Sequence, residues 1–274
     1  MSTYTNEEIR SVQLVELKIL LEIDRICKEH SIEYFLTSGS VLGAVRHGGF
    51  IPWDDDIDIG MSRENYDRFI EIAPHALRKP YVLQTYNTDR YSPILYAKIR
   101  NSDTVFLEYA DRKSKMLQGI FVDLFVYDKV PQDVNVAQNR QIKIQRINKL
   151  NRMRMVTELS APPMNTVQKV KAIIRKAISV ILKLIPHRWL INAYEKEIVK
   201  ENHTESKLYS CWLGPKLYVF EESVLFPPAF MEFEGHLLPV TAKADAYLRQ
   251  AYGDYMKLPP VEERCGHKPY KIEF

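Results

Sequence analysis

Residues 38–59 read SGSVLGAVRHGGFIPWDDDIDI and join a loop of small residues to a dense group of carboxylates. Aspartates occupy four of the five positions 54–58. Two such charges about 4 Å apart repel by roughly 4 kcal/mol at an effective dielectric constant near 20, so a positive charge must compensate them. Two candidates are open: a divalent cation that also binds a phosphate group, or nearby Lys and Arg side chains in a structural ion network.

The residues around this stretch predict how it is built. Residues 33–37 are typical of a short strand, which leads through Ser38, Gly39 and Ser40 into a helical turn at 41–46. Hydroxyl groups and free backbone N–H groups at a helix start stabilise bound phosphate. Acids and isoleucines alternate over residues 56–59, which predicts a strand with both acids on one face.

Asp56 and Asp58 are the first candidate metal ligands. Side chains two positions apart on a strand share a face and lie about 6.5–7 Å apart along the backbone, so both can converge on one ion. Oxygen ligands favour Mg²⁺ or Mn²⁺. For Asp54 and Asp55, a solvated turn is an equally good interpretation. Asp123, within the apolar run 119–125, is the third candidate acid; metal binding, general-base catalysis and pairing with a core cation are all open.

Cationic residues accompany these acids. Arg46 and His47 lie between the small loop and the aspartates, and Lys98 and Arg100 alternate on another predicted strand. They can bind phosphate or neutralise the acids, and the two roles can coexist.

The whole chain sets broader limits. It has 274 residues, 46% of them hydrophobic, which is enough for one large domain or two small ones. A net charge of +3 gives no case for nucleic-acid binding. Three cysteines without CxxC spacing argue against disulfides and structural zinc, and favour a reducing compartment; they are Cys27, Cys211 and Cys265. The start lacks a secretory pattern, and no apolar run reaches the roughly 18 residues of a membrane span.

Periodicity predicts two regions with a boundary near residue 130. Residues 1–130 combine helices at 6–30 and 62–73 with strands at 94–100, 105–109 and 119–127. Residues 131–274 hold long basic helices, interrupted at 161–163, and a C-terminal region that completes the site. That region includes a hairpin around 233–237, a helix at 242–252 and a coil-like tail.

One helix, at residues 167–185, has an apolar stripe with Lys169, Lys176 and Lys183 opposite. Packing of the stripe on the protein core is the more common fate of such a helix. Contact with anionic lipid headgroups is the alternative.

Residues 39–59 taken together resemble the hallmark segment of the LicD family of phosphocholine transferases, which is related to fukutin-type proteins. The resemblance extends to Arg63 and Tyr66 and to residues 119–125, 233–235, 252–256 and 258–260, and is weakest over 135–215. It implies an α+β fold, in which a nucleotidyltransferase-like mixed β-sheet is flanked by helices and joined by an additional helical region.

The resemblance also implies roles for particular residues. Gly39 and Ser40 would bind the donor phosphates, and Asp56, Asp58 and Asp123 would hold Mg²⁺ or Mn²⁺. Asp123 could instead activate the acceptor hydroxyl. From their own chemistry, Ser38 and Lys98 are expected to bind the phosphates as well. The gap between Ser40 and Asp56 is longer than is usual in the wider superfamily, so the pair Asp54 and Asp56 is an alternative.

Two further residues, Arg46 and His267, are expected to assist. Arg46 would steady the diphosphate, and His267 would act at the acceptor or the leaving group, although a lone histidine in a tail is more often structural. A choline headgroup requires an aromatic cage. Trp53, Tyr96 and Trp212 are candidates for it, with core packing as the default for each.

The implied reaction passes a phosphoalcohol from CDP-choline, or a related CDP-alcohol, to a hydroxyl of a cell-surface glycan or its lipid-linked oligosaccharide precursor, and releases CMP. Lipopolysaccharide and teichoic acid are such glycans. The expected location is cytoplasmic, with peripheral contact at the inner face of the membrane through residues 167–185. A nucleotidyltransferase that attacks the nucleotide phosphorus and a catalytically silent glycan-binding scaffold are the alternatives.

Overall fold

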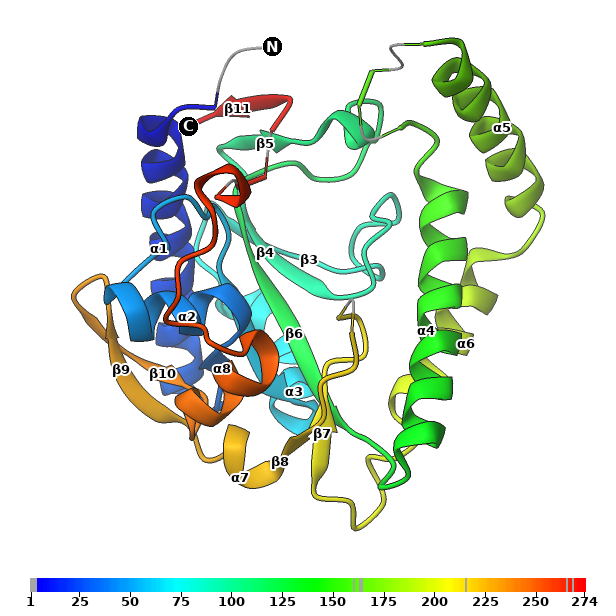
Figure 1. Ribbon diagram of the computed structural model, residues 1–274. Helices are drawn as coiled ribbons and strands as arrows, with labels where there is room; N and C mark the ends of the chain where they lie inside the picture. Colours follow the sequence, from blue (N-terminus) through cyan, green and yellow to red (C-terminus); the bar gives the residue numbers. More distant parts are fainter. Residues whose placement is uncertain (1–3, 160, 163–164, 215, 265, 268) are drawn as a thin grey trace.

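The computed structural model describes residues 4–159, 161–162, 165–214, 216–264, 266–267 and 269–274. The described residues form a mixed nine-stranded sheet with the order β3-β4-β6-β2-β1-β10-β9, and β7 and β8 extend from β6 (Figure 1). The strands are β1 (Phe35–Leu36), β2 (Asp58–Ser62), β3 (Tyr81–Gln84), β4 (Ala97–Asn101), β6 (Phe121–Lys129), β7 (Leu208–Ser210), β8 (Phe220–Glu221), β9 (Ala229–Phe233) and β10 (His236–Val240). A separate two-stranded sheet pairs β5 (Val105–Leu107) with β11 (Lys271–Glu273).

Helices flank this sheet and confirm the predicted α+β class. They are α1 (Asn6–Glu29), α2 (Ser38–His47), α3 (Arg63–Ala76), α4 (Val134–Met155), α5 (Thr166–Leu182), α6 (His187–Ile198), α7 (Glu222–Leu225) and α8 (Ala244–Tyr252). α1 begins with a complete capping box between Thr5 and Glu8, and Ser62 caps α3 by accepting a hydrogen bond from the backbone of Asn65.

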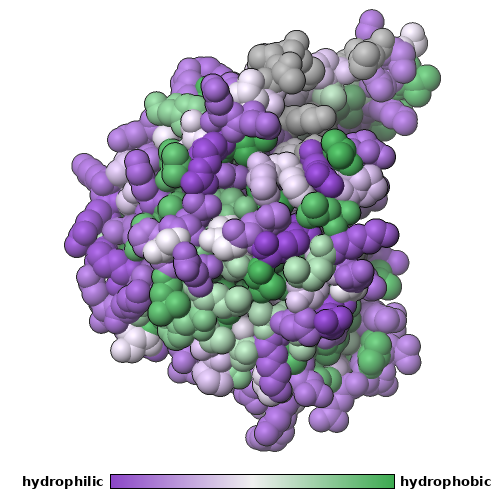
Figure 2. Space-filling view, turned by 60° about the vertical axis from the view of Figure 1, so that its left-hand side comes forward, coloured by the Kyte–Doolittle hydropathy of each residue, from purple (hydrophilic) through white to green (hydrophobic). Residues whose placement is uncertain are grey.

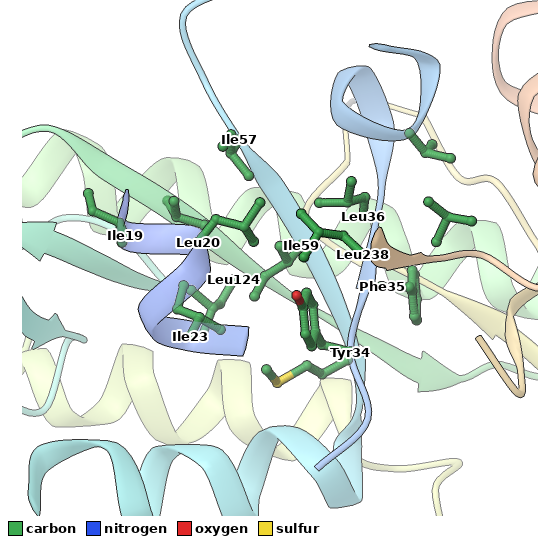
Figure 3. Close-up of a cluster of buried hydrophobic side chains, with 14 of the residues drawn as sticks. Ile19, Leu20, Ile23, Tyr34, Phe35, Leu36, Ile57, Ile59, Leu124 and Leu238 are labelled. Atoms are coloured by element: carbon green, nitrogen blue, oxygen red, sulfur yellow. The ribbon is translucent and has the colours of Figure 1, made fainter. Parts of the chain in front are cut away.

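The two faces of β2 and β6 have different roles. Ile57, Ile59 and Leu124 point toward α1 and form the centre of the buried core with Ile19 and Leu20 (Figure 3). Because side chains alternate along a strand, the acids between these residues point to the opposite face. The hydrophobic core therefore fixes which face of the sheet carries the acids.

The predicted strand at 56–59 differs from the structure at its start. β2 begins at Asp58, and the last backbone contact before it is the hydrogen bond from the Asp123 N–H to the carbonyl of Ile57, at 2.9 Å. Asp56 precedes the ladder and lies in the connecting loop, because no neighbouring strand in the described chain pairs with it. Asp56 thus lies in a loop, whereas Asp58 is the first residue of β2.

The second half of the chain contributes both to the sheet and to a helical layer. α4, α5 and α6 lie beside the sheet (Figure 1), and α4 and α6 enclose a second apolar cluster that contains Ile144, Ile191 and Trp212. The chain then returns to the main sheet, where β10 pairs in parallel with β1. The hairpin predicted around 233–237 is confirmed as β9 and β10, and the tail predicted as coil forms β11. The domain boundary near 130 stays a prediction.

Two remaining sequence expectations concern cysteines and membrane segments. Cys27 and Cys211 are free thiols, and Cys265 lies outside the described residues, as does Pro163 at the predicted helix break. Among the described helices, none combines the length and apolar character needed to cross a bilayer.

Candidate active site

Strand register brings three charged side chains into one row. Asp58 of β2 lies opposite Asp123 of β6, and Asp123 lies opposite Lys98 of β4. The Lys98 Nζ is 2.6 Å from Asp123 Oδ1, and both side chains are buried. One of the three interpretations left open for Asp123, pairing with a core cation, is therefore observed. Burial lowers the pKa of Lys98, and the charge of Asp123 opposes that change.

The small-residue segment packs directly against the aspartates. The backbone N–H of Asp58 donates to Ser40 Oγ at 2.8 Å. A Cβ added at Gly39 would come within 2.8 Å of Asp54 Oδ2, so a side chain there would displace this carboxylate. Ser38 has a φ of 50°, which is uncommon for a residue other than glycine. The geometry joins the helix start of α2 to the acids, as the sequence predicts.

The acids raise one another's pKa values. Burial, followed by the charge of Asp56, raises the pKa of Asp54 to about 8. The pKa of Asp58 is raised well above its usual value by burial and then by the charges of Asp56 and Asp123. Burial also raises the pKa of Asp56, and His267 opposes this effect. Such a cluster retains protons until a cation replaces them.

His267 reaches the same cluster from the far end of the chain. Asp55 is fully buried, and its Oδ1 accepts hydrogen bonds from the backbone N–H of His267 at 2.7 Å and lies 3.1 Å from His267 Nδ1. His267 Nε2 is 4.0 Å from Asp56 Oδ2. The hydrogen bond to Asp55 raises the pKa of His267 to about 9. The histidine thus provides a positive charge beside the acids.

Arg46 lies at the edge of this region. Its Nη1 donates to the carbonyl of Tyr255 at 2.7 Å, and its guanidinium lies 6.0 Å from the centre of the Trp53 ring. Arg264 contacts the same ring at 5.0 Å. These contacts place two cations on Trp53, which makes that ring a poor place for a cationic headgroup.

Two polar residues of α1 also belong to the cluster, and the sequence analysis missed them. Gln13 donates a side-chain hydrogen bond to the carbonyl of Asp54 at 2.7 Å. Glu16 is 1% exposed, and burial followed by the charges of Asp56 and Asp55 raises its pKa. The available signal was their position on the apolar face of α1, where a polar side chain needs a partner: Glu16 lies four residues from both Val12 and Leu20, and Gln13 lies three residues before Glu16.

An aromatic cavity of about 390 Å³ opens next to Asp58. Tyr96, whose ring packs on Phe125 at 4.8 Å, lines one part of it. The remaining walls are Ser38, Tyr127, Cys211, Leu213, Gly214, Lys216, Tyr218, Phe220, Tyr247, Ala251 and Tyr252. Of the three aromatic candidates from the sequence, Tyr96 lines this cavity, Trp53 packs with Arg46, and Trp212 is buried in the second apolar cluster.

A hydrogen-bonded trio supports one end of the cavity. The hydroxyl groups of Thr37, Tyr127 and Tyr247 lie 2.5 to 3.0 Å from one another, and Tyr247 also accepts from the N–H of Ser38 at 3.2 Å. This trio links β1, β6 and α8 and fixes the backbone at the start of α2.

The acids suit a hard divalent cation in chemistry and charge, but they are not preassembled. Around the five aspartates, Lys98 and His267 are the cations with direct ion pairs. Among the described aspartate oxygens, Asp55 Oδ2 is buried with neither a hydrogen-bond nor an ion-pair partner, whereas Asp123 Oδ1 has Lys98 Nζ at 2.6 Å. Within the described part of the chain, no three His, Cys, Asp or Glu side chains are arranged to hold a metal ion together. A metal ion would therefore need other oxygen ligands besides these side chains.

Comparisons with known proteins agree with the motif. The family model described as LicD/FKTN/FKRP, nucleotidyltransferase domain, matches residues 31–168. The chain is 33% identical over 272 residues to lipopolysaccharide cholinephosphotransferase LicD of Haemophilus influenzae, covering 97% of this chain and 96% of that protein. It is also 53% identical over 34 residues to human ribitol 5-phosphate transferase FKRP, covering 12% of this chain and 7% of that protein.

Proposed function

The chain belongs to the LicD family, and we propose that it is a transferase that moves a phosphoalcohol from a CDP-alcohol to a glycan hydroxyl and releases CMP. The relatives support this at the level of the reaction class, because one transfers phosphocholine to lipopolysaccharide and another transfers ribitol 5-phosphate. CDP-choline is the proposed donor. The proposed acceptor is a cell-surface glycan, such as lipopolysaccharide or teichoic acid, or its lipid-linked precursor, modified on the cytoplasmic side.

The aromatic cavity beside Asp58 is the observation that favours choline. A quaternary ammonium group binds over the faces of aromatic rings. Phe125 and Tyr252 line this cavity with no cation over their rings in the described structure. Tyr96 and Tyr218 already have Lys98 and Lys216 at 5.3 and 5.2 Å from their ring centres. The volume of the cavity lies within the range of about 300–1,000 Å³ that is typical of small-molecule sites.

We propose that Asp56 and Asp58 hold Mg²⁺ or Mn²⁺, which would neutralise charge on the donor diphosphate. Gly39 would orient the phosphates with its backbone N–H, and Ser38 and Ser40 with their hydroxyl groups, because the N–H groups of Ser38 and Ser40 already donate to Tyr247 and Thr37. Asp123 stays the proposed third acid and Lys98 the proposed phosphate-binding cation. Their ion pair already holds both side chains next to Asp58.

Arg46 and His267 retain their proposed roles with different support from the structure. The distance of 4.0 Å between His267 and Asp56 supports a role for His267 at the leaving group or the acceptor. Arg46 is bound to Tyr255 and packs on Trp53, so it would steady the diphosphate from the rim of the site.

Product analysis with a panel of CDP-alcohols and Mg²⁺ tests the reaction. We expect CMP from CDP-choline in the presence of a glycan acceptor, and loss of turnover in Asp58→Asn with the fold retained. Release of pyrophosphate or of the phosphoalcohol would support nucleotidyl transfer instead. Turnover that is unchanged in Asp58→Asn would show that Asp58 is not one of the essential acids, whereas no turnover in either protein would support the silent scaffold.

The choice of alcohol has its own test. Replacement of Tyr252 by Leu removes a cavity ring, and we expect KM for CDP-choline to rise roughly two- to thirtyfold, as expected for one cation–π contact. KM for CDP-ribitol should change little. Tyr91→Leu, a change at an exposed tyrosine away from the cavity, is the matched control. Equal effects on both donors would contradict the assignment of the cavity to choline.

A further inference from the structure

The apolar stripe of α5 faces away from the protein. The apolar side chains named below are between 48% and 83% exposed. The last of them, Leu184, lies two residues beyond the end of α5. The exposed members are Val167, Val170, Ile173, Ile174, Val180, Ile181 and Leu184. At 100° per residue they occupy one continuous side of the helix. Packing on the core, the commoner of the two sequence interpretations, is therefore wrong for these exposed residues, whereas Ile178 and Ile185, which the sequence also assigns to the stripe, are partly buried.

α5 is attached to the protein through its polar edge. Arg175 donates to the carbonyl of Val156 at 3.2 Å, and the fully buried Ser179 donates to the carbonyl of Arg154 at 2.9 Å. Lys176 lies 3.9 Å from Glu158. α5 projects from the body at the upper right of Figure 1, beyond α4. The visible face of the body in Figure 2 is by contrast mainly hydrophilic, with apolar residues in small groups.

Basic residues border the exposed stripe. Residues 166–185 contain five cations and no Asp or Glu. Lys169, Lys176 and Lys183 recur every seven residues and lie opposite the stripe expected from the sequence. They border the exposed stripe because it also includes Ile173, Val180 and Leu184, and Lys171 lies at the other border. A helix with an apolar face between lysine rows is typical of segments that lie in the interface of an anionic membrane.

A basic groove adjoins the same surface. It lies between α4 and α5, has a volume of about 550 Å³, and includes Lys149, Arg152, Lys171 and Arg175 among its walls together with apolar side chains. No acidic residue lines it in the described structure. The positively charged surface of α5 thus continues onto α4, and an anionic surface could contact both helices.

We propose that α5 binds parallel to an anionic phospholipid surface, with its apolar stripe inserted at the boundary between headgroups and acyl chains and its lysines on the lipid phosphates. A second copy of the chain fits this face less well, because facing helices would bring their lysine rows together. The proposal goes beyond the transfer reaction and does not depend on it. It would hold the active site near acceptors that are anchored in the membrane.

Vesicle flotation tests the apolar part of the contact. The full chain should float with vesicles that contain phosphatidylglycerol, and the double variant Ile173→Asn with Ile181→Asn should lose this association. Both side chains are more than 60% exposed, so the variant is expected to fold. The matched control is Phe230→Asn with Leu237→Asn, two equally exposed apolar residues on the β9–β10 hairpin, which should float like the wild type.

A lysine series tests the electrostatic part. Substitution of Lys169, Lys176 and Lys183 by Gln should weaken binding to anionic vesicles on the order of a hundredfold, because each lysine near such a surface contributes about a fivefold factor. Substitution of Lys18, Lys115 and Lys257 by Gln, at exposed sites on other elements, should have little effect. Added salt should also weaken the binding of the wild type to anionic vesicles, because it screens the lysine charges.

Three outcomes would overturn the proposal: no flotation of the wild type with anionic vesicles, flotation that survives the double isoleucine substitution, or a dimer in solution that this substitution abolishes. The last would assign the face to a second copy. CMP release with an acceptor free in solution should be the same in all these variants. A failure of lipid binding is thereby distinguished from a failure of the proposed reaction.

Discussion

At the scale of the single residue, Asp54 shows how burial among other carboxyl groups makes an aspartate retain its proton. Its carboxylate lies against Gly39 and beside Asp56, and burial together with that neighbour raises its pKa to about 8. At neutral pH, without a bound cation, it holds its proton in the folded protein and loses it in the unfolded chain. The folded state therefore binds more protons than the unfolded state between about pH 4 and pH 8.

This difference predicts the pH dependence of stability. The free energy of unfolding of the metal-free protein should fall as the pH rises from about 4 to 8, by up to about 1.4 kcal/mol per pH unit for this one group. Asp54→Asn should flatten that fall and stabilise the protein at pH 8. Urea unfolding at several pH values measures this pH dependence, and Asp103→Asn, a substitution at an exposed aspartate, is the control. An unchanged slope in Asp54→Asn would show that Asp54 titrates normally.

Metal binding is predicted to compete with these protons. If Asp56 and Asp58 hold Mg²⁺, its addition should raise Tm, and more so at pH 8 than at pH 5, because the ligands must be deprotonated. Asp58→Asn should remove this increase. Calorimetric melting with and without Mg²⁺ provides the measurement, with Ca²⁺ as a comparison ion. An increase in Tm that persists in Asp58→Asn would place the ion elsewhere.

At the level of elements, the pairing of β2, β6 and β4 decides which charges meet. Lys98 and Asp123 form a buried ion pair across β4 and β6, with Asp58 next in the row. Removing one partner leaves the other buried and unpaired, which typically costs about 3–5 kcal/mol. Lys98→Met and Asp123→Asn should each be strongly destabilising.

A double-mutant cycle tests this pair directly. The combination of Lys98→Met with Asp123→Leu should recover much of the stability lost in Lys98→Met alone, because it removes the unpaired charge. Urea unfolding of the four proteins gives the coupling energy. Additive losses would mean that the two side chains do not compensate each other. Activity should stay low in all three variants, since both residues belong to the proposed site.

The same elements show how far sequence carries the prediction. Alternation of Ile57 and Ile59 with acids is a local signal, and it correctly predicted a strand with one buried and one acidic face. The parallel register of Asp58 with Asp123 depends on residues far apart in the chain, so the pairing of Asp123 had to be left open. Asp56 was wrongly placed on the strand because alternation does not show where a partner strand ends. The outward direction of the α5 stripe was likewise set by polar contacts with Arg154 and Val156.

At the scale of the whole molecule, the two ends of the chain meet at the candidate active site. α1 supplies Gln13 and Glu16 beneath the acidic loop, and the tail returns through His267 to Asp55. Beyond the histidine, β11 pairs with β5, and the N–H of Tyr270 donates to the carbonyl of Leu107 at 2.6 Å. Gly266 is required at this crossing, because a Cβ there would lie 2.5 Å from Asp55 Oδ1.

This closure predicts a tail whose stability depends on His267. Its pKa is raised to about 9 by the hydrogen bond to Asp55, so the histidine stabilises the folded state fully below about pH 6.5, and this contribution is lost as the pH rises through about 9. His267→Gln should remove it at every pH. Hydrogen bonds to charged groups contribute about 1.5–3 kcal/mol, so amide exchange in β11 should accelerate roughly ten- to hundredfold at pH 7, with β2 and β6 unaffected. The control is His236→Gln, on the exposed β9–β10 hairpin, which should leave amide exchange in β11 unchanged. Equal protection of β11 in His267→Gln and in the wild type would show that pairing with β5 alone holds the tail.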